Sequence, residues 1–172
     1  MHQMPKNLPS RLHPTLTRFR DIWAGLKGNR ELPGPEDFSL DKFADFLPNI
    51  CWIDVENSGA DTRRYRYQFV GQALSEVIGA DVSGRYLDEI FGEDAYDWLQ
   101  REYEDAIANK SPSYHSFLRN TVDNALIFYE RLLLPFGREG EEACGFLALH
   151  LTTIKGAASF TDIDCPLPVR LT

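Results

Sequence analysis

Cysteine is scarce in this sequence and no long hydrophobic run occurs in it, and each absence excludes a class of protein. The three cysteines, Cys51, Cys144 and Cys165, lie far apart and form no C-x-x-C pair, which argues against a disulfide framework and a zinc knuckle. The longest apolar stretch, residues 131–136, is far too short to cross a membrane, and residues 1–14 lack the apolar segment of a signal peptide. We therefore expect a cytoplasmic protein with no membrane segment and no metal site.

Positive charge is also in short supply. The 172 residues have a net charge of −8, which would repel a phosphate backbone, so we expect no nucleic-acid binding. The one basic cluster, residues 63–66, is too short for a basic stripe and fits the solvated start of a strand. Hydrophobic residues make up 43% of the chain and charged residues 26%, which is typical of one globular domain with its own core.

The first regular element that we expect is an amphipathic helix that begins at Pro14 and ends near Gly28. Residues 1–13, which are polar and interrupted by prolines, are expected to form a flexible tail. An apolar stripe on this helix either folds back onto the sheet of the same chain or packs against a second copy or another partner. The candidate dimer or partner contacts in the stripe are Phe19, Ile22, Trp23 and Leu26.

The remaining pattern predicts an α+β domain over residues 14–156, followed by a C-terminal tail at 157–172. A short helix at residues 39–47 should end before Pro48. Strands at 50–55 and 64–70 should pair antiparallel, and strict alternation should point Tyr65, Tyr67 and Phe69 to one side. Helical pieces are expected at 72–78, 86–91 and 93–109, and strands at 113–119, 125–136 and 145–154. The result is a five-stranded antiparallel sheet with helices on one face.

Several short signatures resemble those of PAS domains. They read YQFVG at residues 67–71, ALSEVIG at 73–79 and SGRYLDEIF at 83–91, and they lie where a PAS domain passes from its second strand into its helices. The opening helix, a proline-bearing connector and ERLLLPF at residues 130–136 look similar to a family of bacterial stand-alone PAS-like proteins with no assigned reaction. The resemblance covers residues 14–154 and implies a sensory or interaction module.

The resemblance also bears on cofactors, and we expect none. Haem-binding PAS domains place a histidine on the long helix, and residues 93–109 contain no histidine. Light-sensing flavin relatives need a cysteine in the helical region, and residues 71–110 contain no cysteine. His115 and His150 are expected to be ordinary histidines, because neither has a second ligand at metal-binding spacing. Neighbouring acidic residues, including Glu102, Glu104 and Asp105, are interpreted as solvated helix faces rather than as acid/base pairs.

Aromatic side chains should gather between the helices and the sheet, either as a filled core or as the wall of a ligand cavity. Arg131 lies in an apolar strand, so it must face water or pair with a carboxylate, which an acidic ligand or a structural Glu or Asp could supply. The candidate ligand-binding residues are Tyr67, Phe69, Leu74, Ile78, Phe91, His115, Phe117, Arg131, Leu132 and Leu147.

The sequence thus favours a non-catalytic sensory or protein-interaction module that binds a small apolar or weakly acidic ligand. We expect it to form a homodimer and to relay its signal to a separate signalling protein. Two alternatives stay open. One is a small-molecule enzyme with a cone-shaped α+β fold, which would need a buried carboxylate with a raised pKa. The other is a structural adaptor with a filled core.

Overall fold

The computed structural model describes residues 8–9, 11–57, 62–120 and 126–155; the side chains of residues 77, 117–120, 126–127 and 153–155 are not among those described. The predicted tails therefore lie outside the described residues, except for residues 8–9 and 11–13 at the N-terminal end. In that segment Leu8 and Leu12 are partly buried against the core.

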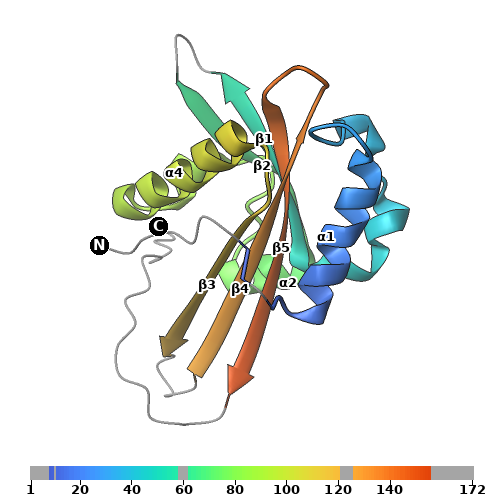
Figure 1. The fold of residues 1–172 in the computed structure, drawn as a ribbon. Helices are drawn as coiled ribbons and strands as arrows, with labels where there is room; N and C mark the ends of the chain where they lie inside the picture. Colours follow the sequence, from blue (N-terminus) through green and yellow to red (C-terminus); the bar gives the residue numbers. More distant parts are fainter. Residues whose placement is uncertain (1–7, 10, 58–61, 121–125, 156–172) are drawn as a thin grey trace.

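The order of the elements along the chain agrees with the prediction (Figure 1). Two helical segments, α1 (Pro14–Lys27) and the 3-10 helix η2 (Leu40–Asn49), with the short η1 (Pro35–Asp37) between them, precede strands β1 (Ile50–Asn57) and β2 (Arg63–Val70). Then come α2 (Gln72–Ile78), α3 (Leu87–Ile90) and α4 (Glu93–Asn109), followed by β3 (Ser113–Asn120), β4 (Leu126–Gly137) and β5 (Ala143–Lys155). The predicted stop before Pro48 is wrong, because η2 continues through it to Asn49.

The five strands form one antiparallel sheet in the order β2-β1-β5-β4-β3. The first and last of these five strands, β1 and β5, thus lie side by side in the middle of the sheet, and the helical insertion α2–α4 connects its two edges. This confirms the predicted α+β fold with a five-stranded antiparallel sheet. Among the described residues, no helix is both long and apolar enough to cross a membrane.

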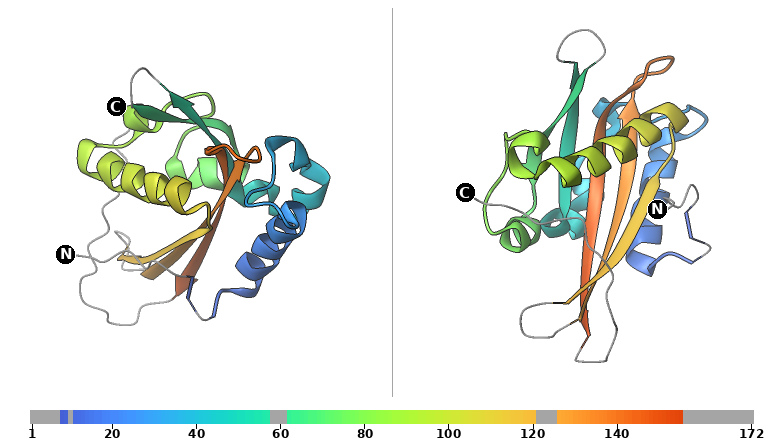
Figure 2. Two further views of the ribbon diagram at one scale, coloured as in Figure 1. Left: turned by 45° about the horizontal axis from the view of Figure 1, so that its top comes forward. Right: turned by 90° about the vertical axis from the view of Figure 1, so that its left-hand side faces the viewer.

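Helix α4 covers one face of the sheet, which we call the inner face, and α1 covers the opposite, outer face (Figure 2). On the inner face Tyr103 of α4 stacks on Phe146 of β5, with ring centroids 5.3 Å apart. On the outer face Trp23 of α1 donates a hydrogen bond from Nε1 to the carbonyl oxygen of Pro135, at 2.8 Å. That carbonyl is accessible because the pairing of β4 with β3 ends at Leu133.

A bulge in the β1–β2 pair corrects one expectation about β2. Trp52 pairs with Phe69 and Ile53 pairs with Tyr67, so Gln68 is an extra residue on β2. One extra residue reverses the alternation beyond it. Tyr67 is therefore buried on the inner face, whereas Phe69 turns to the outer side and is 38% exposed. The prediction that Phe69 shares a face with Tyr65 and Tyr67 is wrong.

Gly71 follows β2 directly and is required by close packing. A Cβ atom at this position would collide with the backbone carbonyl oxygens of Leu47 and Pro48. Its amide also donates to the carbonyl oxygen of Ile50, at 2.8 Å. The chain can therefore pass from β2 to α2 tightly against the end of η2 only with glycine here.

Candidate functional site

A buried ion pair joins α4 to the centre of the sheet on the inner face. Arg131 of β4 donates from Nη2 to Oε2 of Glu102, and the two residues are only 4% and 2% exposed. The second carboxylate oxygen of Glu102 accepts a hydrogen bond from the Ser113 hydroxyl, at 2.9 Å. Burial opposes the charge on Arg131, but the Glu102 carboxylate raises the pKa of the guanidinium above its ordinary value. The guanidinium is therefore charged, and Glu102 is its partner in the ion pair.

A chain of three polar side chains lies beside this pair. His150 of β5 contacts the Cys51 thiol, with Nε2 3.4 Å from Sγ, and its Nδ1 is hydrogen-bonded to the Tyr129 hydroxyl. Burial and, to a smaller extent, the nearby charge of Arg131 together lower the pKa of His150 to about 3. Burial likewise raises the pKa of the Cys51 thiol to about 12. A neutral thiol beside a neutral imidazole is the opposite of an activated nucleophile, so the arrangement does not favour cysteine catalysis.

Aromatic rings enclose the guanidinium of Arg131. Its Cζ lies 5.5 Å from the ring centroid of Trp98 and 5.8 Å from that of Tyr103, both on α4. Trp98 in turn lies against His115 of β3, with ring centroids 4.3 Å apart. We call the following residues the inner polar cluster: Cys51, Tyr67, Glu102, Tyr103, Tyr129, Arg131 and His150. Trp98 and His115 border this cluster.

The structure separates the predicted ligand-binding residues onto both sides of the sheet. Tyr67, His115 and Arg131 lie on the inner face. Leu132 and Leu147 lie on the outer face, because each directly follows an inward-facing residue of its strand, Arg131 and Phe146 respectively. They are fully buried there, and Leu147 pairs with Trp52, whose ring contacts Phe136.

Four other predicted ligand residues complete the comparison. Leu74 of α2 is buried, and Ile78 and Phe91 are partly buried. The side chain of Phe117 is outside the described residues, although its backbone pairs with Tyr129. The predicted single cavity wall is thus wrong for Phe69, Leu132 and Leu147, which do not lie on the face that holds Tyr67 and Arg131.

Sequence reasoning missed most of the inner polar cluster. Glu102 was interpreted as solvated together with its acidic neighbours, and this interpretation is wrong because Glu102 is almost fully buried. A signal was present: Glu102 lies in the apolar stripe of α4, three residues after Leu99 and four before Ala106. Arg131 was expected either to face water or to pair with a carboxylate, and the second alternative is confirmed, with Glu102 of the same chain as the partner.

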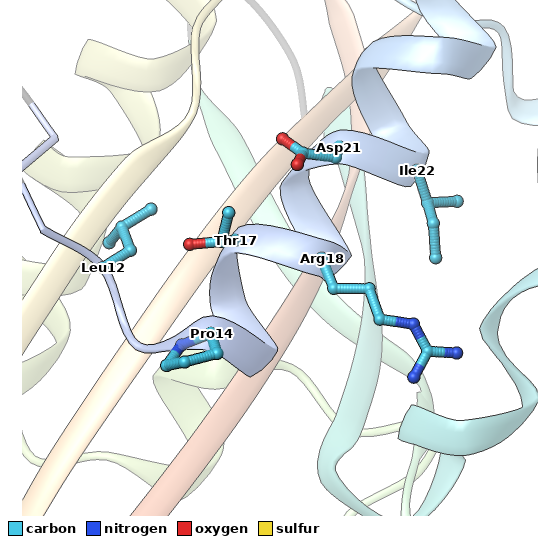
Figure 3. A pocket seen from close by; sticks show the side chains of 6 residues that line it. All are labelled: Leu12, Pro14, Thr17, Arg18, Asp21 and Ile22. Carbon is cyan, nitrogen blue, oxygen red and sulfur yellow. The ribbon is translucent and has the colours of Figure 1, made fainter.

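The candidate partner contacts on α1 also divide into two groups. Phe19 and Trp23 are 0% and 4% exposed, so they pack within the chain itself and are not surface residues. Phe19 contacts Phe43 of η2, with ring centroids 5.4 Å apart. Ile22 and Leu26 are only partly buried. Ile22 also borders an open depression over the exposed side of α1, which Figure 3 shows with its lining residues Leu12, Pro14, Thr17, Arg18, Asp21 and Ile22.

A model of the family described as PAS domain matches residues 11–150. The chain belongs to the PAS domain family. This PAS domain is also similar to solved structures at low identity, and no curated protein matches it. The PAS-B domain of Cycle from Drosophila melanogaster, a structure with bound glycerol, is 15% identical, with 61% of this chain and 99% of that chain covered and a TM-score of 0.43.

Two bacterial structures give similar values. A PAS domain from Colwellia psychrerythraea is 12% identical, with 66% of this chain and 96% of that chain covered and a TM-score of 0.45. The LOV protein of Rhodobacter sphaeroides is 10% identical, with 80% and 67% covered and a TM-score of 0.42. The family assignment therefore depends on the match to the family model, which confirms the predicted PAS domain. Membership of a bacterial stand-alone family stays a prediction.

Histidine, cysteine and carboxylate side chains do not converge on a metal position in the described part of the PAS domain: no group of three or more is arranged to hold an ion. The inner polar cluster instead offers hydrogen-bond donors from Arg131 and Tyr103, and the bordering Trp98 adds aromatic surface. These are groups suited to a small organic molecule.

His150 should make the stability of this domain fall in acid. Its pKa is about 3 in the folded protein and about 6.5 in an unfolded chain, so the unfolded state binds the proton first as pH falls. The contribution is complete above about pH 6.5 and is lost progressively towards pH 3. Between pH 7 and pH 5 the free energy of unfolding should fall by about 2 kcal/mol because of His150. The free energy of unfolding in urea is measured at both pH values for the wild type and for His150→Gln. The fall from pH 7 to pH 5 should be smaller by about 2 kcal/mol in the variant. An equal fall in the two proteins would contradict the role of His150.

Proposed function

We propose that this PAS domain is a non-catalytic sensory module that binds a small molecule at the inner polar cluster and passes the signal to a separate protein. The observation that supports this proposal is the group of polar and charged side chains that are buried under α4. A purely structural core is best filled with apolar side chains, because a buried ion pair gains little over a hydrophobic replacement. Arg131 and Glu102 lie instead where the longest helix of the insertion meets the central strands.

Non-catalytic action is part of this proposal. The Cys51–His150 pair has the composition of a catalytic dyad but the wrong protonation, since burial keeps the thiol and the imidazole neutral. The buried carboxylate of Glu102 is occupied by Arg131 and Ser113 and so is not poised to move a proton. A cytoplasmic location and homodimerisation, both predicted from the sequence, also remain part of the proposal. The open depression near Ile22 is the surface that we assign to the partner contact.

Native mass spectrometry of the protein purified under mild conditions tests the ligand claim. We expect an additional mass that is retained in the native spectrum and lost on denaturation, together with a rise in melting temperature when the released molecule is added back. A protein that carries no additional mass and shows no thermal shift with a broad metabolite panel would instead support the structural adaptor.

A further inference from the structure

The two edges of the sheet differ in how they are closed. At the β2 edge, the Tyr67 amide donates to the carbonyl oxygen of Arg85, at 3.0 Å, and the Gly84 amide donates to the carbonyl oxygen of Tyr67, at 2.6 Å. At the other edge, no strand or bridge of the described residues pairs with the side of β3 that points away from β4. One row of β3 backbone donors and acceptors therefore faces away from the sheet.

Strand β3 also lacks the features by which proteins usually protect an edge strand. It pairs with β4 over all of its residues, Ser113–Asn120, without a bulge. The strand contains no proline, lysine or acidic residue, and Arg119 is its only residue with a full charge. Long regular edges of this kind accept a further strand from another polypeptide, because main-chain hydrogen bonds then continue the ladder. β3 therefore offers a place for a sixth strand.

A buried carboxylate lies beside this edge on the outer face of the sheet. Glu130 of β4 is 7% exposed, and its Oε1 accepts a hydrogen bond from the Tyr114 hydroxyl of β3, at 2.9 Å. Among the described residues, no lysine, arginine or histidine forms an ion pair with Glu130. A carboxylate that is buried without a cation is costly, so Glu130 indicates a cation that the described part of the chain does not supply.

The register of the sheet places Glu130 within reach of a side chain from an added strand. Glu130 pairs directly with Ser116 of β3. Adjacent strands lie about 4.8 Å apart, so the residue opposite Ser116 on an added strand would be about 10 Å from Glu130. The small Ser116 side chain leaves room for a lysine or arginine of the added strand to extend across it to the carboxylate.

The charge of the chain distinguishes between the possible occupants of this edge. The side of α4 that carries Trp98, which contacts β3, also carries the exposed Asp94, Arg101 and Asp105, because they lie four before, three after and seven after Trp98. A second copy would bring a net charge of −8 to this acidic protein. Residues 156–172 contain two prolines and two aspartates, and proline cannot donate to a ladder. A basic segment of a different protein meets neither obstacle.

We propose that β3 receives an extended basic segment of a separate protein as a sixth strand, with a lysine or arginine of that segment paired to Glu130 across Ser116. The inference names the kind of partner that the proposed function requires, and it rests on the proposed function for the existence of that partner. It does not depend on a small molecule at the inner polar cluster or on the depression near Ile22.

Three peptides of the same length as β3 test the added strand and its charge. One alternates valine and lysine, the second alternates valine and glutamate, and the third is the valine–lysine peptide with every backbone amide methylated, which removes its donors. Binding is measured by nuclear magnetic resonance titration of the full chain. We expect the valine–lysine peptide to shift the amide signals of residues 113–120 and to bind at least about tenfold more tightly than the other two.

Three results of this titration overturn the inference. They are no binding of the valine–lysine peptide, binding of either other peptide as tightly, and shifts confined to other parts of the sheet. Signals of β3 that change with protein concentration before any peptide is added would show that a second copy occupies the edge, and this result also overturns it. The small-molecule ligand is judged separately by native mass spectrometry.

A matched pair of variants tests the carboxylate in the protein. Glu130→Gln keeps a polar side chain beside the Tyr114 hydroxyl, so the protein should stay folded while its affinity for the valine–lysine peptide falls about tenfold. Glu141→Gln removes the same charge from an exposed residue in the turn between β4 and β5 and should bind the peptide as the wild type does. Equal peptide affinity in these two variants overturns the inference.

Ser116→Lys tests the same position without removing the carboxylate. The new lysine lies directly across from Glu130, so it should pair with Glu130 and take the place of the cation from the added strand. We expect this variant to melt at a higher temperature than the wild type and to bind the valine–lysine peptide about tenfold more weakly. Unchanged peptide affinity in Ser116→Lys overturns the inference.

Discussion

Replacing Arg131 by methionine should destabilise the protein by about 3–5 kcal/mol. The substitution leaves Glu102 buried at 2% exposure without its cationic partner, and a lone carboxylate in the interior is costly. Glu102→Met should cost a similar amount, because it leaves Arg131 charged and unpaired. The double variant removes both charges and should recover to within about 1–2 kcal/mol of the wild type, since a well-packed apolar pair is about as stable as a buried ion pair. Urea denaturation of the four proteins gives the coupling free energy directly.

Arg63 provides the matched control for this cycle. It also reaches from a strand to a glutamate of α4, in this case Glu104, and it pairs with Glu142 as well. Its side chain is 25% exposed, so solvent screens both pairs and Arg63→Met should cost only about 1 kcal/mol. If Arg131→Met costs no more than Arg63→Met, or if the double variant is as unstable as the sum of the single ones, the ion pair does not hold α4 on the sheet.

The sheet could be predicted from the sequence because its three hairpins, β1–β2, β3–β4 and β4–β5, are local features. The faces of the later strands could not. In β4 the residues from Leu132 to Phe136 are apolar without interruption, since α4 and α1 bury both sides of the sheet. Alternation is invisible in such a run, which is why Leu132 and Leu147 were expected beside Arg131. In β2 the alternation was visible but misleading, because the bulge at Gln68 cannot be seen before the pairing with β1 is known.

The candidate site was predictable in part for a different reason. A charged residue inside an apolar strand must either face water or meet an opposite charge, so these two alternatives for Arg131 follow from its sequence context alone. Which carboxylate it meets depends on how α4 lies across the sheet, and α4 contains five acidic residues besides Glu102. Contacts such as Cys51 with His150 join residues 99 positions apart and have no local signature at all.

Trp23→Ala should produce the other large effect, a loss of about 3–5 kcal/mol, although α1 lies outside the elements that hold the inner polar cluster. Trp23 is 4% exposed, and its replacement by alanine removes both the packing of the ring and the hydrogen bond from Nε1 to the Pro135 carbonyl oxygen. Trp23→Phe keeps most of the packing and should lose less. The free energy of unfolding in urea ranks the three proteins.

Ile22→Ala separates the role of α1 in the fold from its role on the surface. Ile22 is next to Trp23 on the same helix but is only partly buried, so this variant should lose about 1 kcal/mol or less. If the depression beside Ile22 is the contact between two copies, sedimentation of Ile22→Ala should show weaker self-association at nearly unchanged stability. A wild type that is monomeric at high concentration removes the dimer from the proposal. A Trp23→Ala protein as stable as Ile22→Ala would mean that α1 does not anchor the outer face, because the buried tryptophan is what distinguishes the two positions.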